Sequence, residues 1–205
     1  MKKLESSLKN MVIVLTSVTV IAGGLLGYVN ELTQEPIAQA NAKALSAAIE
    51  TVVPGFDNNP AANPETIDLD GSSYKIYKAT KNGEFIGAAV ESSANGFGGK
   101  ISVLVGFDKE GNIIDYSLLS HAETPGLGSK AADWFKKGNK GDITGMNPGT
   151  KALIVTKDGG QVDAITASTI TSRAFLTAVN NAYAAYNGQH VDGNTSATSK
   201  ESKTN

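Results

Sequence analysis

The sequence predicts an α+β domain, an antiparallel sheet with flanking helices, preceded by one N-terminal transmembrane helix. Three observations indicate this: strand-like runs joined by short turns, helical patterns on either side of them, and an uncharged apolar run near the N-terminus. Runs of strands followed by helices, without regular alternation, are typical of the α+β class. At 205 residues, the chain has room for one domain of ordinary size plus appendages.

The apolar run, residues 11–29, contains no charged side chain. A helix rises about 1.5 Å per residue, so this run gives roughly 28 Å of helix, which suffices to span a bilayer. Lysines precede the run and glutamates follow it: Lys2, Lys3 and Lys9 on one side, Glu31 and Glu35 on the other. By the positive-inside rule, we expect residues 1–10 in the cytoplasm and the chain after Asn30 outside it.

A cleaved signal peptide is the alternative to an anchor. Ala38, Gln39 and Ala40 look like a small-residue cleavage site. However, the apolar run is longer than the roughly 7 to 15 residues of a signal-peptide core. Two glutamates and Pro36 also lie between the end of the run and that site. An uncleaved transmembrane helix at residues 11–29 therefore fits better.

Residues 30–65 are predicted to form a connecting helix and a loop. The stretch 36–53 is rich in alanine, and its apolar residues are spaced for one helical face. Pro54 and Gly55 end this helix, and residues 56–65 contain turn formers with little apolar content. We expect a surface loop there, followed by a domain over residues 66–187.

Strand-like runs open that domain, at residues 73–80, 84–92, 100–108 and 113–119. Most of the connections between them are short turns, which favours antiparallel pairing. Two more short strands are expected at 152–156 and 161–165, on either side of a turn at 157–160.

Helical patterns flank these strands. Residues 131–137 predict a short helix, and residues 172–186 a longer one. The longer helix has an apolar stripe made of Phe175, Leu176, Val179, Ala182, Tyr183 and Tyr186. Residues 188–205 are polar and almost without bulky apolar side chains, so burial cannot offset their ordering entropy. We expect a disordered tail.

Composition excludes several classes of function. A net charge of −2 gives no electrostatic reason to expect a nucleic-acid partner. The absence of cysteine excludes disulfides, iron–sulfur clusters, thiolate zinc sites and cysteine nucleophiles. The two histidines, His121 and His190, are far apart in sequence, so we expect no metal site. Any redox chemistry must therefore come from an organic cofactor.

Residues 163–173, DAITASTITSR, carry five hydroxyl side chains just before the amphipathic helix. The ordinary explanation is N-capping, in which Ser or Thr satisfies free backbone amides. The functional explanation uses the same physics, because the amides and dipole at a helix N-terminus favour a phosphate group. The residues of this cluster alone leave both explanations open.

Two glycine-rich segments precede this cluster. Residues 95–100, NGFGGK, are typical of a long hairpin loop. Residues 123–128, ETPGLG, combine a proline-fixed bend with two glycines and a carboxylate, which indicates a rigid turn. Neither segment is specific by itself.

Taken in order, GFGGKISVLVGFD, SHAETPGLG and DAITASTITS strongly resemble the FMN-binding domain shared by the G subunit of the Rnf electron-transport complex and the C subunit of the sodium-pumping NADH:quinone reductase. The resemblance covers roughly residues 69–186 and the N-terminal span. It implies covalent FMN, held through a phosphoester on the second conserved threonine of a hydroxyl motif.

The resemblance also implies a site residue by residue. In the hydroxyl motif, Asp163 matches the family's Asp, Thr166 the first hydroxyl, Thr169 the flavin-bearing threonine and Thr171 the final hydroxyl. Ala167 and Ser168 stand where the family usually has Gly and Ala. The ETPGLG run matches the family's flavin-side loop. The candidate flavin contacts are therefore Glu123, Thr124, Gly126, Leu127 and Gly128. No catalytic residue or metal ligand is expected.

A one-electron carrier is the function that the resemblance implies, anchored in the bacterial cytoplasmic (inner) membrane by a single span with an extracytoplasmic C-terminal domain. It would be an electron-transfer component of a larger complex, not a stand-alone enzyme. Its partners would be other membrane subunits and a flavin transferase, which attaches FMN from FAD with release of AMP and the help of magnesium.

Between the two relatives, the short outer domain that begins soon after the span favours the Rnf protein. An Rnf complex moves electrons between reduced ferredoxin and NAD, coupled to ion movement. The alternatives are the C subunit of a sodium-pumping NADH:quinone reductase and a flavin-free, membrane-anchored scaffold module. Ala167 and Ser168 are the residues that favour the scaffold.

Overall fold

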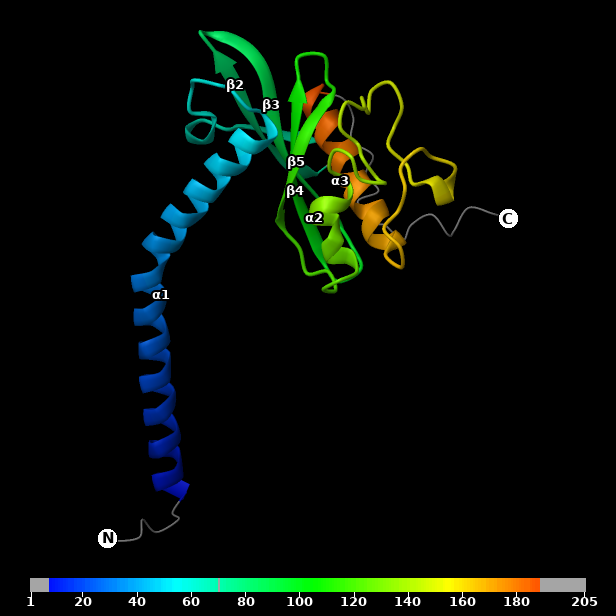
Figure 1. Cartoon of the computed structure of the whole chain (residues 1–205). Helices are drawn as coiled ribbons and strands as arrows, with labels where there is room; N and C mark the ends of the chain where they lie inside the picture. The colour runs from blue at the N-terminus through cyan, green and yellow to red at the C-terminus, as the bar shows by residue number, and fades with distance from the viewer. Residues whose placement is uncertain (1–7, 70, 189–205) are drawn as a thin grey trace. The chain divides into compact units, whose positions relative to one another are not determined.

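The computed structural model describes residues 8–69 and 71–188 (Figure 1). The chain forms two compact units that divide after Ala44, and each is described by itself. The expected tail at 188–205 lies, apart from Gly188, outside the described residues, as does most of the segment 1–10.

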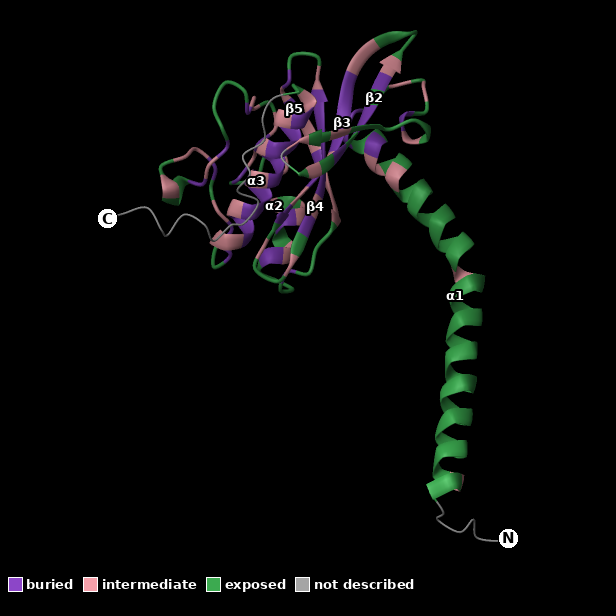
Figure 2. Cartoon of the chain, turned by 180° about the vertical axis from the view of Figure 1, so that it is seen from behind, coloured by how far each residue is buried: buried purple, intermediate pink, exposed green. Residues whose placement is uncertain are grey.

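The first unit consists of most of helix α1 (Leu8–Val52), whose residues 8–44 are exposed almost throughout (Figure 2). Its most apolar window has a mean hydropathy of 2.1, so α1 is long and apolar enough to cross a membrane. The two helical segments expected on either side of residue 30 are one continuous helix, which includes Pro36. No glycine lies between Asn30 and Glu35 to end the helix there.

Within the described residues, the second unit holds one antiparallel sheet in the order β1-β2-β3-β4-β5. The strands are β1 (Glu65–Leu69), β2 (Ser72–Lys81), β3 (Glu84–Asn95), β4 (Lys100–Asp108) and β5 (Ile113–Ser120). Between β2 and β3, Asn82 and Gly83 have φ angles of 52° and 81°. Positive φ at both central residues is the geometry of a two-residue hairpin turn. The predicted fold class and the four predicted N-terminal strands are confirmed, and β1 is an additional strand.

Both faces of the sheet are covered. Helix α3 (Thr169–Tyr186) packs on β3 and β4 and shares a core with Val103 and Val105. The other face carries a smaller cluster that contains Leu104 and the end of α1, including Val52. Strand side chains alternate between faces, which explains why β4 contributes to both cores. A Cβ on Gly106 would lie 2.0 Å from the Val52 carbonyl oxygen, so only glycine allows α1 this close.

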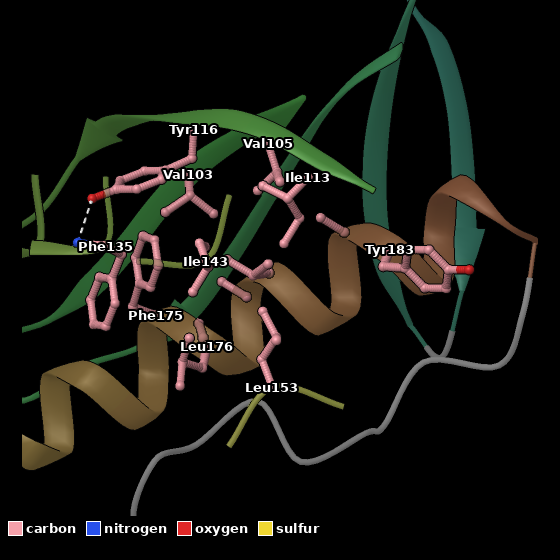
Figure 3. Close-up of a cluster of buried hydrophobic side chains, with 14 of the residues drawn as sticks. Val103, Val105, Ile113, Tyr116, Phe135, Ile143, Leu153, Phe175, Leu176 and Tyr183 are labelled. Carbon is pink, nitrogen blue, oxygen red and sulfur yellow. Dashed lines mark hydrogen bonds between the residues drawn. The ribbon is translucent and has the colours of Figure 1, made fainter. Parts of the chain in front are cut away.

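An aromatic cluster anchors α3 to the sheet (Figure 3). Phe135 and Phe175 stack with ring centroids 4.3 Å apart, and Tyr116 meets Phe175 edge-on at 4.7 Å. The Tyr116 hydroxyl donates to the carbonyl of Ala131 at 2.7 Å, so the polar end of this buried ring is satisfied. Helix α3 therefore begins from a fixed position on the sheet.

The prediction of two strands at 152–156 and 161–165 is wrong. Among the described residues, this segment has only an isolated parallel bridge between Val155 and Val162, around a 3₁₀ turn, η3 (Thr156–Asp158). Its backbone groups bond locally, for example the N–H of Thr156 to the carbonyl of Val162 at 2.8 Å. The apolar residues reach the core from a folded-back loop and do not extend the sheet.

The predicted helices are both present with shifted bounds. Helix α2 (Ala131–Trp134) is shorter than the predicted 131–137 and is preceded by the 3₁₀ turn η2 (Gly128–Lys130). Helix α3 starts three residues before the predicted 172, so Thr169 is its first residue. This earlier start places three of the five hydroxyls in the first turn of the helix, those of Thr169, Thr171 and Ser172.

Candidate functional site

The carboxylate of Glu123 joins the three segments singled out in the sequence. One of its oxygens accepts a hydrogen bond from the backbone N–H of Gly98 at 2.9 Å, and the other accepts from the Thr171 hydroxyl. Glu123 is 5% exposed and Thr171 is 1% exposed. A buried carboxylate is costly unless hydrogen-bonded, and these two donors supply that compensation. The NGFGGK loop, the ETPGLG loop and α3 are thus held at one point.

Glycine is required where these segments touch. A Cβ on Gly128 would lie 2.5 Å from a Glu123 carboxylate oxygen and 2.7 Å from the Thr171 hydroxyl. A Cβ on Gly98 would lie 2.2 Å from the carbonyl oxygen of Ala122. Close approach to the buried Glu123–Thr171 pair therefore explains Gly128, and close approach to the Ala122 backbone explains Gly98.

The N-terminus of α3 is not capped in the ordinary way. The N-cap residue is Ser168, and its side chain makes no capping hydrogen bond within the described residues. The neighbouring Ser172 hydroxyl instead accepts from the N–H of Ile165 and donates to the carbonyl of Ser168, both at 2.9 Å. The amides of the first turn of α3 are therefore available to an anionic group.

Ala167 has a φ of 61°, in the left-handed region that favours glycine. The backbone at Ala167 therefore has the conformation suited to the glycine that the resemblance implies here, although the residue is alanine. A left-handed conformation costs roughly 1–2 kcal/mol for an L-residue with a Cβ. Ala167 therefore carries a local backbone strain.

A cavity of about 440 Å³ lies against this turn. Its lining consists of Phe97, Glu123, Thr124, Leu127, Gly128, Ala167, Ser168, Thr169, Ile170 and Thr171. The volume is in the range of small-molecule sites, roughly 300–1,000 Å³. Phe97 and Leu127 are large apolar side chains that are 71% and 41% exposed, respectively. The cavity therefore combines an apolar rim with hydroxyls and a helix N-terminus.

Six of the nine predicted site residues line this cavity, namely Glu123, Thr124, Leu127, Gly128, Thr169 and Thr171. In the part of the chain that the structure describes, Gly126, Asp163 and Thr166 lie outside the lining. The N–H of Gly126 donates to the Ser129 hydroxyl at 2.9 Å. The Asp163 carboxylate accepts from the Thr156 hydroxyl at 3.2 Å, which ties the loop before α3 to η3.

Several residues at this site were not singled out from the sequence. Phe97 and Ile170 line the cavity, and Lys157 donates from its ammonium to the Thr169 hydroxyl oxygen at 3.0 Å. An aromatic residue between glycines in a loop was an available signal for Phe97. Lys157 carried no such signal, because it lies twelve residues upstream in a turn that was predicted only as a connection.

Comparison with known proteins gives a consistent result. Residues 96–184 match the family described as the FMN-binding domain. The chain is 36% identical over 187 residues to the G subunit of the ion-translocating oxidoreductase complex of Shewanella piezotolerans, over 85% of this chain and 87% of that protein. It is 36% identical over 172 residues to the corresponding protein of Yersinia pestis, over 78% and 81% of the two chains. For the protein of the same name in Cereibacter sphaeroides the identity is 33% over 165 residues, covering 77% and 74%.

Fold, cavity and family match define an FMN-binding domain preceded by a long apolar helix. The chain belongs to the family of G subunits of ion-translocating oxidoreductase complexes. This membership confirms the resemblance drawn from the three motifs.

Proposed function

We propose that the protein is a membrane-anchored electron carrier with FMN covalently attached to Thr169, in an Rnf-type ion-translocating ferredoxin:NAD oxidoreductase complex. The observation that supports this most strongly is the position of Thr169. It is half-buried, it is the first residue of α3, and it lines the cavity. A hydroxyl there can bear a phosphoryl group directly in front of the first-turn amides.

The residues present fit the flavin group. Phe97, Leu127 and Ile170 offer apolar surface to a large planar ring, and Thr124 offers a hydroxyl at the same cavity. The uncapped N-terminus of α3 and the Lys157 ammonium offer positive potential to the phosphate. Bound flavin would supply the ability to accept and release one electron at a time. The protein itself would hold the ring, limit the contact of the ring with water and tune the reduction potential of the flavin through nearby dipoles.

We further propose that α1 spans the inner membrane and that the FMN-binding domain is extracytoplasmic. The lysines before the apolar run and the glutamates after it support this orientation. A dissociated flavin could not readily be replaced outside the cytoplasm, so a covalent bond keeps the carrier functional through repeated turnovers. The other membrane subunits of the complex are the expected electron donors and acceptors.

Attachment would require a separate flavin transferase. A threonine hydroxyl is a weak nucleophile, and a transferase with bound magnesium supplies both its activation and the neutralisation of charge at phosphorus. The described residues contain no group of three or more His, Asp or Glu side chains arranged to hold a metal ion. The chain is proposed to be the acceptor in this reaction.

A flavin-free scaffold remains the second candidate because Ala167 replaces the usual glycine. The decisive measurement is the intact mass of the denatured full-length protein from its native membrane, with in-gel ultraviolet fluorescence and peptide mapping. We expect the mass of one FMN on the peptide that contains Thr169, and its loss in Thr169→Ala. Thr177→Ala, a threonine in the middle of α3, is the matched control and should retain the flavin. An unmodified Thr169 peptide from cells with an active flavin transferase would favour the scaffold.

A further inference from the structure

Lys157 lies beside the atom that the proposed function makes reactive. Its ammonium donates to the Thr169 hydroxyl oxygen at 3.0 Å, from η3, twelve residues upstream of α3. Both side chains are accessible, since Lys157 is exposed and Thr169 half-buried. A cation is therefore already placed at the hydroxyl that would attack phosphorus.

The turn that carries Lys157 is fixed on both sides of this residue. On one side, the Asp158 carboxylate accepts two hydrogen bonds from the Arg173 guanidinium, both at 2.8 Å. Arg173 lies one helical turn after Thr169, so this bidentate pair ties η3 to the first turns of α3. On the other side, the Thr156 hydroxyl donates to Asp163 at 3.2 Å. The base of the lysine side chain is thus positioned by contacts that do not involve its charge.

In the part of the chain that the structure describes, no carboxylate forms an ion pair with the Lys157 ammonium. Among the described residues, the ion pairs of the domain use Lys75, Lys78, Lys136 and Arg173. The nearest acidic side chain in sequence, Asp158, faces Arg173. The positive charge of Lys157 is therefore directed at the Thr169 hydroxyl.

We propose that Lys157 is the cation that assists flavin attachment at Thr169 and then neutralises the resulting phosphodiester; this inference rests on the proposed function. In the reaction, the bond between the Thr169 oxygen and phosphorus forms, and the bond from that phosphorus to the AMP leaving group of FAD breaks. The hydroxyl proton passes to a base of the transferase or to solvent, and AMP leaves with the electron pair. No atom is oxidised or reduced.

The ammonium contributes to this step in two ways. While the hydroxyl loses its proton, a donated N–H stabilises the negative charge that develops on the oxygen. After the bond forms, the unbridged phosphate oxygens carry a permanent negative charge within reach of a flexible four-carbon side chain. Lysine is suited to both tasks because its charge is compact and its three N–H groups can change partner.

The test uses full-length protein purified in detergent from cells without a flavin transferase. It is incubated with purified transferase, FAD and magnesium. The initial rate of covalent flavin attachment is measured by in-gel fluorescence at several concentrations of the protein. For Lys157→Met we expect the maximal rate to fall by roughly tenfold. Loss of a buried oxyanion donor typically costs about 10²–10³ in rate, and the effect here should be smaller because Lys157 is exposed. Lys157→Arg should retain most of the rate, and Lys151→Met, at another exposed lysine, should match the wild type.

Charge is separated from structure by chemical rescue. Ethylammonium chloride should restore part of the rate in Lys157→Ala, whereas sodium chloride at the same ionic strength should not. Thermal unfolding of each variant identifies any loss of folding. If Lys157→Met or Lys157→Ala is destabilised, the Lys157→Arg and rescue results still decide whether the charge assists flavin attachment. Equal rates for wild type and Lys157→Met, or equal losses for Met and Arg, would overturn the role of Lys157 alone. A wild-type chain that accepts no flavin at Thr169 would instead overturn the proposed function.

Discussion

The hydroxyl of Thr171, on the first turn of α3, donates a hydrogen bond to the buried carboxylate of Glu123, 48 residues earlier in the chain. The other carboxylate oxygen accepts from the backbone of Gly98. One side chain thus holds two loops and a helix at the edge of the cavity. Geometry at the proposed flavin site therefore depends on a polar contact that is inaccessible to water.

Thr171→Val tests this contact. Valine has nearly the same shape as threonine but cannot donate, so the buried carboxylate loses one of its two partners. We expect the free energy of unfolding to fall by about 1–3 kcal/mol, measured by urea denaturation in detergent. Thr171→Ser keeps the donor and should lose less. Thr177→Val, on a half-buried part of the same helix, is the control, and the proposed role of the contact is wrong if both valine variants are equally stable.

Ala167→Gly should stabilise the protein. Ala167 has a φ of 61°, and removal of its Cβ relieves a strain of roughly 1–2 kcal/mol, partly offset by the extra entropy of glycine in the unfolded chain. We expect a net gain of up to about 1 kcal/mol in the same assay. Ala152→Gly, at an exposed alanine outside the left-handed region, should lose stability. A loss in both variants would show that the backbone at Ala167 is unstrained.

The fold was largely predictable because local signals agreed with tertiary pairing. The short turn expected between the runs 73–80 and 84–92 is present, and the Asn82–Gly83 dipeptide there is typical of a two-residue hairpin. The prediction of strands within residues 152–165 was wrong because apolar spacing indicates burial but does not indicate the hydrogen-bonding partner. Val155 and Val162 are both buried, yet they only face each other in an isolated bridge within a loop, where Val162 bonds to Ile154 and Thr156. Strand β1 was missed because it is only five residues long and comes directly after a loop rich in turn formers.

Recognition of the site depended on motif order, and its contacts depended on three-dimensional placement. The resemblance implied Glu123 as a flavin contact and Thr171 as the final hydroxyl of the flavin motif, but the hydrogen bond between them was not foreseen. Lys157 could not be predicted, since its position follows from the ion pair of Asp158 with Arg173 on the facing helix. Long-range polar contacts of this kind have no periodic signature in one sequence.

Phe175→Ala should remove the main anchor of α3. The ring stacks on Phe135 at 4.3 Å and meets Tyr116 edge-on, and it is fully buried. Truncation of a buried phenylalanine typically costs about 3–5 kcal/mol, a large part of the roughly 5–15 kcal/mol that stabilises a domain. We expect a much lower urea midpoint, with a smaller effect for Phe175→Leu. A loss below about 1 kcal/mol for the alanine variant would mean that α3 is held mainly by other contacts.

Alkaline pH should weaken the sheet through Tyr77. Burial, and then the charge and hydrogen bond of Glu91, raise the pKa of Tyr77 from its usual 10 to about 12. The folded state therefore holds the tyrosine proton more tightly than the unfolded state, so this contribution to stability is fully present below pH 10. It is lost as the pH rises from 10 through 12, because the unfolded chain ionises first. Urea unfolding at several pH values should show a decline for the wild type that is smaller in Tyr77→Phe, which cannot ionise. An equal decline in the wild type and Tyr77→Phe would remove Tyr77 as its cause.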